Sequence, residues 1–128
     1  MTTTQTAAVA HAVADAYIAV WNETDPQRRM RLLREHWAED ARYADPMMQG
    51  AGLAQIDALI AGVHERFAGF RFTRTGTPDG HGEHVRFAWT LGPAGAAEAP
   101  IAGTDVLQMD GGRIRTVIGF LDRVPAAA

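Results

Sequence analysis

Three polar side chains fall at positions where the surrounding pattern predicts apolar ones, and such residues could carry acid–base chemistry. Asp105 shares its strand parity with Ile101 and Leu107, so its carboxyl group is expected to lie among hydrocarbon. Burial disfavours the charged form of a carboxyl group, and the pKa of Asp105 is therefore expected to rise. A protonated Asp could then donate a hydrogen bond to a substrate oxygen on which negative charge develops.

Tyr17 and Asp45 are the two other residues of this kind. Tyr17 lies on the apolar stripe of a helix predicted over residues 6–22, so its hydroxyl group is expected to point inward. Asp45 ends a short predicted strand, immediately before Pro46. A base beside two hydrogen-bond donors is a workable arrangement for proton transfer. The catalytic interpretation requires all three side chains to converge on one cavity.

Each of the three residues also has an ordinary structural explanation. A buried Asp in a strand often accepts hydrogen bonds from the amides of a neighbouring loop. A Tyr on the inner face of a helix is more often a core residue than a catalyst, and an Asp before Pro is a common turn former. The residue types and their spacing leave both interpretations open.

Other chemistries have weaker support in the sequence. His81 and His84 could suggest a metal site, but they lie where a strand begins after a turn, and no third ligand is obvious. The chain has no Cys, which removes thiolate ligands and cysteine nucleophiles. No Gly-rich turn joins a strand to a helix, and the net charge of −3 comes without a basic stripe. We therefore expect no metal, no cofactor and no nucleic-acid partner.

Three helices are expected to position the N-terminal candidates. Apolar residues recur at three- and four-residue spacing over residues 6–22, 25–37 and 53–67. Asp25 and Pro26 favour the start of the second helix. The Asp carboxylate can accept hydrogen bonds from unpaired backbone N–H groups of the first turn, and Pro lacks an N–H group that would have no partner there. This helix also carries four arginines that are expected to be mostly solvated, at positions 28, 29, 31 and 34.

After the third helix the apolar period changes from helical spacing to two, which predicts strands. Turn signals at Thr77–Gly80 and Asp110–Gly112 separate the predicted strands, and a loop rich in Gly, Ala and Pro covers residues 92–100. Four long strands are expected, over residues 70–76, 84–91, 101–109 and 113–121.

This order of elements predicts an α+β fold, with three N-terminal helices packed on a strongly bent mixed or antiparallel sheet. The 128 residues are enough for one domain, 1–128, with an ordered core over about 7–122 and frayed ends at 1–5 and 125–128. Helices on one face of a bent sheet form a cone with an interior. The residues expected to line this interior as substrate-binding walls are Trp21, Trp37, Met48, Leu59, Phe87, Trp89 and Phe120.

The opposite, convex face of the sheet mixes apolar and polar residues, a composition that suits a homodimer interface. We expect a homodimer formed through this face. Its predicted residues are Arg71, Thr73, Arg86, Thr90, Thr104, Val106, Gln108, Val117 and Leu121.

The sequence resembles the nuclear transport factor 2-like superfamily, which includes the ketosteroid isomerases and the SnoaL-like polyketide cyclases. The resemblance covers about residues 7–122, and its most telling stretches are 16–22, 37–46 and 103–107 followed by 110–114. It implies the cone-shaped, cystatin-like fold and a dimer. It also implies residue roles, because a ketosteroid isomerase uses an Asp base facing an oxyanion hole of Tyr and protonated Asp.

The resemblance places Asp45 at the position of the general base, Tyr17 at the oxyanion tyrosine and Asp105 at the oxyanion aspartic acid. The leading hypothesis is therefore an isomerase or cyclase that moves a proton next to the carbonyl of a small apolar substrate. The isomerases support their oxyanion tyrosine with further tyrosines, and this chain has only Tyr17 and Tyr43.

Two other functions stay open at this stage. The same cone could hold a hydrophobic ligand without catalysis, or it could serve as a dimerisation module. Hydrolysis by activated water would need an Asp–Arg–Asp relay whose central Arg cannot be placed inside the cone.

The N-terminus lacks the basic region of a signal peptide, and no apolar run is long enough to span a membrane, so a cytoplasmic location without membrane contact is expected.

Overall fold

The second helix begins where its capping residues predict. In the computed structural model, which describes residues 7–125, the Asp25 carboxylate accepts a hydrogen bond from the Arg28 backbone N–H at 3.0 Å, and Pro26 is the first helical residue. The predicted frayed ends fall outside the described residues, except for Pro125. The three helices are α1 (Ala7–Asn22), α2 (Pro26–His36) and α3 (Leu53–Arg66).

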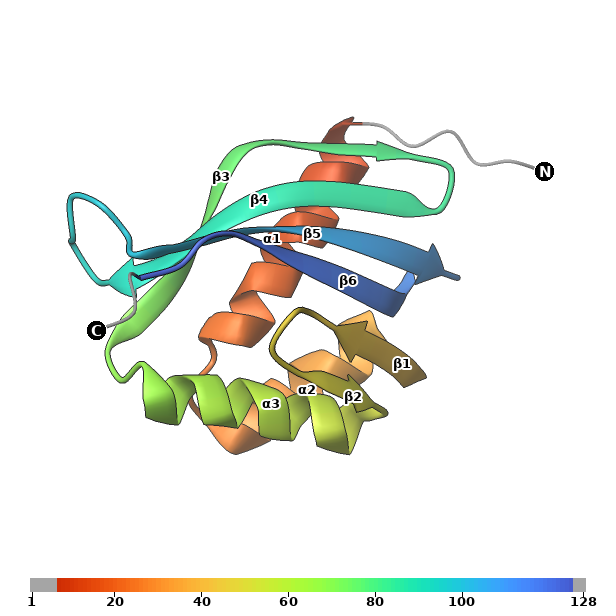
Figure 1. Ribbon diagram of the computed structural model, residues 1–128. Helices are drawn as coiled ribbons and strands as arrows, with labels where there is room; N and C mark the ends of the chain where they lie inside the picture. The colour runs from red at the N-terminus through yellow and green to blue at the C-terminus, as the bar shows by residue number, and fades with distance from the viewer. Residues whose placement is uncertain (1–6, 126–128) are drawn as a thin grey trace.

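Six strands form one open sheet in the order β2-β1-β6-β5-β4-β3. Strands β3 to β6 are antiparallel neighbours in sequence order, whereas β1 returns to pair parallel with β6. Figure 1 shows this sheet curving over the helices. The predicted α+β class is confirmed, with bounds β1 (Trp37–Ala44), β2 (Gln49–Ala51), β3 (Phe70–His81), β4 (His84–Pro93), β5 (Ile101–Asp110) and β6 (Arg113–Arg123).

The predicted turn at Thr77–Gly80 is wrong, because β3 continues through it. The register of β3 against β4 shifts between Thr75 and Asp79, so the extra residues are absorbed as an irregularity within the strand. β3 is an edge strand, where a Pro that cannot donate to a ladder is tolerated. The chain reverses instead at Gly82, whose φ of 54° suits a residue without a side chain.

A second register shift reverses the expected orientation of β6. Counting by two from Ile114 predicts Phe120 inside and Val117 outside. The structure has Phe120 52% exposed on the outer face and Val117 buried. The β5–β6 register shifts between Gln108 and Met109, so β6 holds one extra residue there and every later side chain changes face. Phe120 is therefore not a pocket residue, and the predicted outer face is wrong in its β6 members.

The arginines of α2 were expected to be mostly solvated, and Arg29 is an exception at 2% exposure. Its Nε donates to Asp57 of α3 at 2.6 Å, and a second nitrogen donates to the backbone carbonyl of Glu23 at 2.8 Å. The neighbouring His64 Nε2 lies 2.6 Å from the carbonyl oxygen of Trp21. A buried charge is tolerated when it is paired and hydrogen-bonded in this way. The network joins the end of α1 to α2 and α3, and so fixes the backbone that carries Trp21.

The core lies between the helices and the concave face of the sheet. Helix α1 packs against β3 and β4, and α3 lies against β1 and β2. On β5, Ile101, Gly103, Asp105 and Leu107 are all buried, which confirms the predicted inner face of that strand. No helix within residues 7–125 is both long enough and apolar enough to cross a membrane.

Candidate active site

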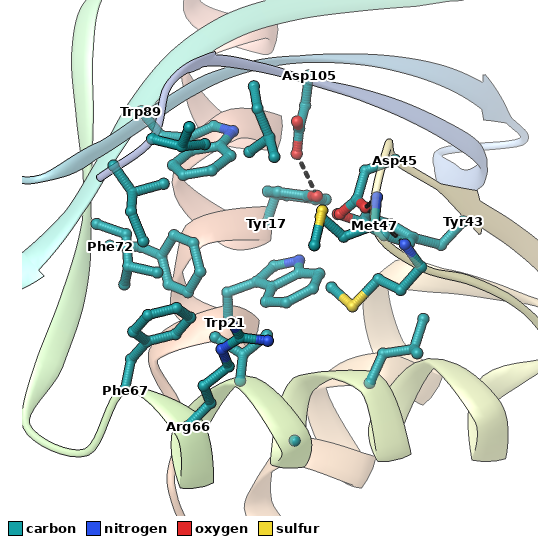
Figure 2. Close-up of a pocket in the computed structure, with 18 of the residues that line it drawn as sticks. Tyr17, Trp21, Tyr43, Asp45, Met47, Arg66, Phe67, Phe72, Trp89 and Asp105 are labelled. Carbon is teal, nitrogen blue, oxygen red and sulfur yellow. Dashed lines mark hydrogen bonds between the residues drawn. The ribbon is translucent and has the colours of Figure 1, made fainter. Parts of the chain in front are cut away.

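A cavity of about 670 Å³ opens between α1, α3 and the concave face of the sheet (Figure 2). Its walls are mostly apolar, and its few polar groups include two carboxyl groups and two tyrosines. Four of the seven predicted wall residues line it, namely Trp21, Met48, Leu59 and Trp89. The cavity also takes in Pro125, from the end that was predicted to be frayed.

Trp37, Phe87 and Phe120 were predicted to line the cavity, and the structure places none of them there. Trp37 and Phe87 are fully buried behind Tyr17, with ring centroids 5.6 Å and 5.1 Å from its ring. Side chains on the inner face of a sheet can pack under a helix as well as against a cavity, and parity alone does not distinguish the two. These two aromatic residues hold the Tyr17 ring in place, whereas Phe120 lies on the opposite face of the sheet.

Tyr17 and Asp105 form a buried pair at the polar end of the cavity. The Tyr17 hydroxyl donates to Asp105 Oδ2 at 2.5 Å, and both residues are 2% exposed (Figure 2). Burial raises the pKa of Asp105 to about 6, although the bond from Tyr17 favours the carboxylate and opposes this shift. Burial and the charge of Asp105 together raise the pKa of Tyr17 well above its usual value. Asp105 Oδ1 has no hydrogen-bond partner among the described residues.

Asp45 also pairs with a tyrosine, but in a more polar setting. The Tyr43 hydroxyl donates to Asp45 Oδ2 at 2.6 Å. The backbone N–H groups of Met47 and Met48 donate to Asp45 Oδ1 at 2.7 and 2.9 Å. Oδ1 is therefore fully used by the turn, and Oδ2 keeps one lone pair that can accept a proton. Burial raises the pKa of Tyr43 far above its usual value, and the charges of Asp105 and Asp45 add to the effect.

Gly119 lies between the two carboxyl groups. It pairs with Asp105 across the β5–β6 ladder. A Cβ atom at this position would lie 2.9 Å from Asp105 Oδ1 and 3.2 Å from Asp45 Cβ. Both residues therefore face the same small space, which stays open because position 119 has no side chain.

Several residues of the site were not predicted from the sequence. Tyr43 stands two residues before Asp45, near the end of β1, and this two-residue spacing was the available signal. Phe67 and Phe72 line the apolar end of the cavity, and Arg66 points into it from α3 (Figure 2). The Arg66 guanidinium lies 5.6 Å from the centroid of the Phe67 ring and forms no ion pair with a described residue. Its position at the last turn of α3 gives no sequence signal for a pocket.

The part of the chain that the structure describes holds no cluster of metal-ligand side chains. Within residues 7–125, no three His, Asp or Glu side chains are grouped as metal ligands. His81 and His84 face each other across the β3–β4 hairpin with ring centroids 5.7 Å apart, and neither lines the cavity. The site is therefore a set of carboxyl, phenol and indole groups in an apolar cavity, which suits proton transfer to and from carbon.

Comparison with known proteins gives a consistent result. The model of the SnoaL-like domain family matches residues 14–117. The crystal structure of a candidate isomerase of the SnoaL-like family from Agrobacterium tumefaciens strain C58 is 44% identical to this chain. That comparison covers 90% of this chain and 98% of the other, with a TM-score of 0.86. No curated protein matches the chain.

Two more distant structures support the fold. One is a candidate ketosteroid isomerase from Kribbella flavida, 21% identical over 100% of this chain and 86% of the other, with a TM-score of 0.70. The other is a candidate polyketide cyclase from Sinorhizobium meliloti, 13% identical over 84% of this chain and 93% of the other, with a TM-score of 0.67. At these identities the likeness concerns the fold alone.

Proposed function

This chain belongs to the SnoaL-like family, and we propose that it is an enzyme that moves a proton next to the carbonyl group of a small apolar substrate. The observation that carries the proposal is the pair of carboxyl groups, each held by its own tyrosine, on either side of Gly119 in an otherwise apolar cavity. Isomerisation and aldol-type cyclisation both begin with the same proton removal.

Asp45 is the base in this mechanism. Its Oδ2 takes a proton from the carbon next to the substrate carbonyl, the C–H electron pair moves into the new C=C bond, and the carbonyl oxygen becomes an enolate oxygen. Isomerisation is completed when Asp45 returns the proton to a different carbon. Cyclisation is completed when the enolate carbon bonds to a second carbonyl carbon and the proton held by Asp45 passes to the alkoxide oxygen that this creates. The two backbone bonds to Oδ1 and the bond from Tyr43 hold the carboxylate in one orientation.

Asp105 is the acid that stabilises the enolate oxygen. Tyr17 donates to Oδ2, so the unpartnered Oδ1 is the oxygen that carries the proton and donates a hydrogen bond to the enolate oxygen of the substrate. Tyr17 then acts as a positioning residue for Asp105, rather than as a direct donor to the substrate oxygen, the role that the family resemblance implied. With a pKa of about 6, roughly a tenth of Asp105 is protonated at pH 7 in the empty cavity. A developing negative charge beside it favours the protonated form further.

Deuterium exchange tests this function directly. We expect the protein to exchange the α-hydrogens of an apolar ketone, 2-tetralone, in D₂O faster than buffer alone. Asp45→Asn should abolish the enzymatic exchange, and Asp105→Asn should reduce it. Tyr17→Phe should shift the pH dependence, because the bond that stabilises the Asp105 carboxylate is lost and its pKa rises further. Exchange by the wild type at the buffer rate, across a panel of such ketones, would rule out this catalysis.

Non-catalytic binding of a hydrophobic ligand is the second candidate function. The observation that favours it is that Asp45 accepts three hydrogen bonds, as an Asp that only stabilises a turn would do. In that case 2-tetralone should bind in the cavity while its α-hydrogens exchange at the buffer rate. Asp45→Asn should then lower the stability of the protein and leave ligand affinity unchanged.

A further inference from the structure

Two buried indole groups of the cavity have a hydrogen-bond donor without a partner. The Nε1 atoms of Trp21 and Trp89 form no hydrogen bond with a described residue, and the side chains are 2% and 7% exposed. A buried N–H without a partner costs free energy, and native proteins leave few of them. Both residues line the cavity, so a bound ligand is the natural partner for these donors.

Both donors face the polar end of the cavity. Figure 2 shows the indole nitrogen of Trp89 on the side of its ring toward Asp105, and that of Trp21 on the side toward Tyr17. Neither nitrogen reaches hydrogen-bond geometry with these neighbours. Each nitrogen nevertheless lies close enough to favour the anionic form of its neighbour. This effect is smaller than that of burial, which raises the pKa values of both Tyr17 and Asp105. The N–H groups thus point to the region where the proposed reaction develops negative charge on oxygen.

The known contacts leave this region short of donors. Tyr17 already donates its only hydroxyl proton to Asp105 Oδ2, and Tyr43 donates its own to Asp45. Asp105 contributes one donor at most, from Oδ1 when it is protonated. Enolate oxygens are stabilised by two or more preorganised donors in a cavity that excludes water.

The rigidity of the two indoles suits this task. The ring of Phe72 stands edge-on between them, 5.4 Å from Trp21 and 5.3 Å from Trp89. Trp89 packs against Gly103 so closely that a Cβ at that position would lie 2.3 Å from its ring. Because aromatic packing fixes both rings, the N–H groups keep their direction without a hydrogen bond of their own.

We propose that Trp21 and Trp89 donate indole N–H bonds to an oxygen of the ligand, so that the cavity selects flat apolar molecules carrying a carbonyl or enolate oxygen. This inference rests on the proposed function for the identity of that oxygen. It makes the two indoles direct ligand contacts, with Asp105 as the third donor. A hydrocarbon of the same shape would fill the same walls and leave both N–H groups unpaired.

Binding of 2-naphthol, which mimics the enol of 2-tetralone, tests the proposal against naphthalene as the matched hydrocarbon. In the ¹⁵N-labelled wild type, 2-naphthol should move two of the three indole N–H signals downfield, and naphthalene should not. The third signal, from Trp37, serves as an internal reference, since its Nε1 is also buried and unpartnered but does not line the cavity. Measurement on the wild type avoids any dependence on how well a variant folds.

Substitution then measures each donor separately. Trp21→Phe and Trp89→Phe should each weaken 2-naphthol binding about tenfold, as expected for one lost hydrogen bond, and change naphthalene binding much less. Equal losses for both ligands, unmoved indole signals or no binding of 2-naphthol would each overturn the proposal. Catalysis is read separately from the deuterium exchange. Moved indole signals without exchange would leave the two donors established and the proposed reaction rejected.

Discussion

The two Asp–Tyr pairs of the cavity have the same chemistry and opposite surroundings. Asp105 is almost fully buried and accepts one hydrogen bond, from Tyr17. Asp45 is half-buried and accepts three, one from Tyr43 and two from backbone N–H groups. Burial favours the protonated form of Asp105, whereas three donors hold the Asp45 carboxylate in one orientation. In the proposed mechanism, the surroundings of the two carboxyl groups, and not the residue type, separate the acid from the base.

The largest expected effect separates the two roles by rate. Asp45→Asn removes the proton acceptor and should lower deuterium exchange of 2-tetralone about 10³-fold or more. Asp105→Asn keeps a side-chain N–H donor of similar shape and should cost about 10²-fold or less. Exchange rates of the two variants, measured at the same pH, provide the comparison. Equal losses would show that the two carboxyl groups do not have distinct roles.

Stability against pH tests the protonation of the buried pair. The folded-state pKa of Asp105 is about 6, against an ordinary value of 3.8. The contribution of Asp105 to the free energy of unfolding is therefore complete below pH 3.8 and is lost as the pH rises through 6. The Asn side chain in Asp105→Asn carries no charge. The free energy of unfolding of this variant should therefore rise by about 2 kcal/mol relative to that of the wild type between pH 4.5 and pH 8. Urea unfolding at the two pH values measures this difference. The exposed Asp79→Asn is the control and should show no such gain.

Gly119 tests whether the space between the pairs is needed. Gly119→Ala would press a methyl group against Asp105 Oδ1 and Asp45 Cβ, and overpacking of this kind typically costs roughly 1–2 kcal/mol. We also expect exchange to fall more than tenfold, because the methyl group occupies the space proposed for the substrate. Gly62→Ala is the matched control, since Gly62 also lines the cavity, away from the two carboxyl groups, and its Cβ would meet nothing within 4 Å. Unchanged exchange in Gly119→Ala would place the substrate elsewhere in the cavity.

The outer face of the sheet should have the smallest effect on chemistry. Ile118 and Phe120 are 50% and 52% exposed there, and the dimer expected through this face remains a proposal. Phe120→Glu should shift the protein from dimer to monomer in sedimentation at micromolar concentration. The Phe120 side chain is exposed and does not line the cavity, so exchange per chain should stay within about twofold. Sedimentation of the wild type as a monomer would rule out the proposed dimer.

Periodicity allowed much of the fold to be predicted. Alternation on β4 and β5 placed Asp105 inside, and helical spacing placed Tyr17 opposite it, although the two residues are 88 positions apart. The errors arose where a strand is irregular. One extra residue in β6 turned Phe120 outward, and an irregularity in β3 removed the turn expected at 77–80. Such shifts depend on pairing with a neighbouring strand, which a single strand's pattern does not record.

The sequence by itself determined the class of fold, the inner face of β5 and the three polar residues that share the cavity. Only the tertiary structure decided that Asp105 Oδ1 and two indole N–H groups of the cavity lack partners among the described residues, and that Gly119 keeps the space between the two carboxyl groups open. The physical reason is that local periodicity follows from the backbone geometry of one segment. The protonation and orientation of a side chain follow instead from atoms that distant segments bring against it.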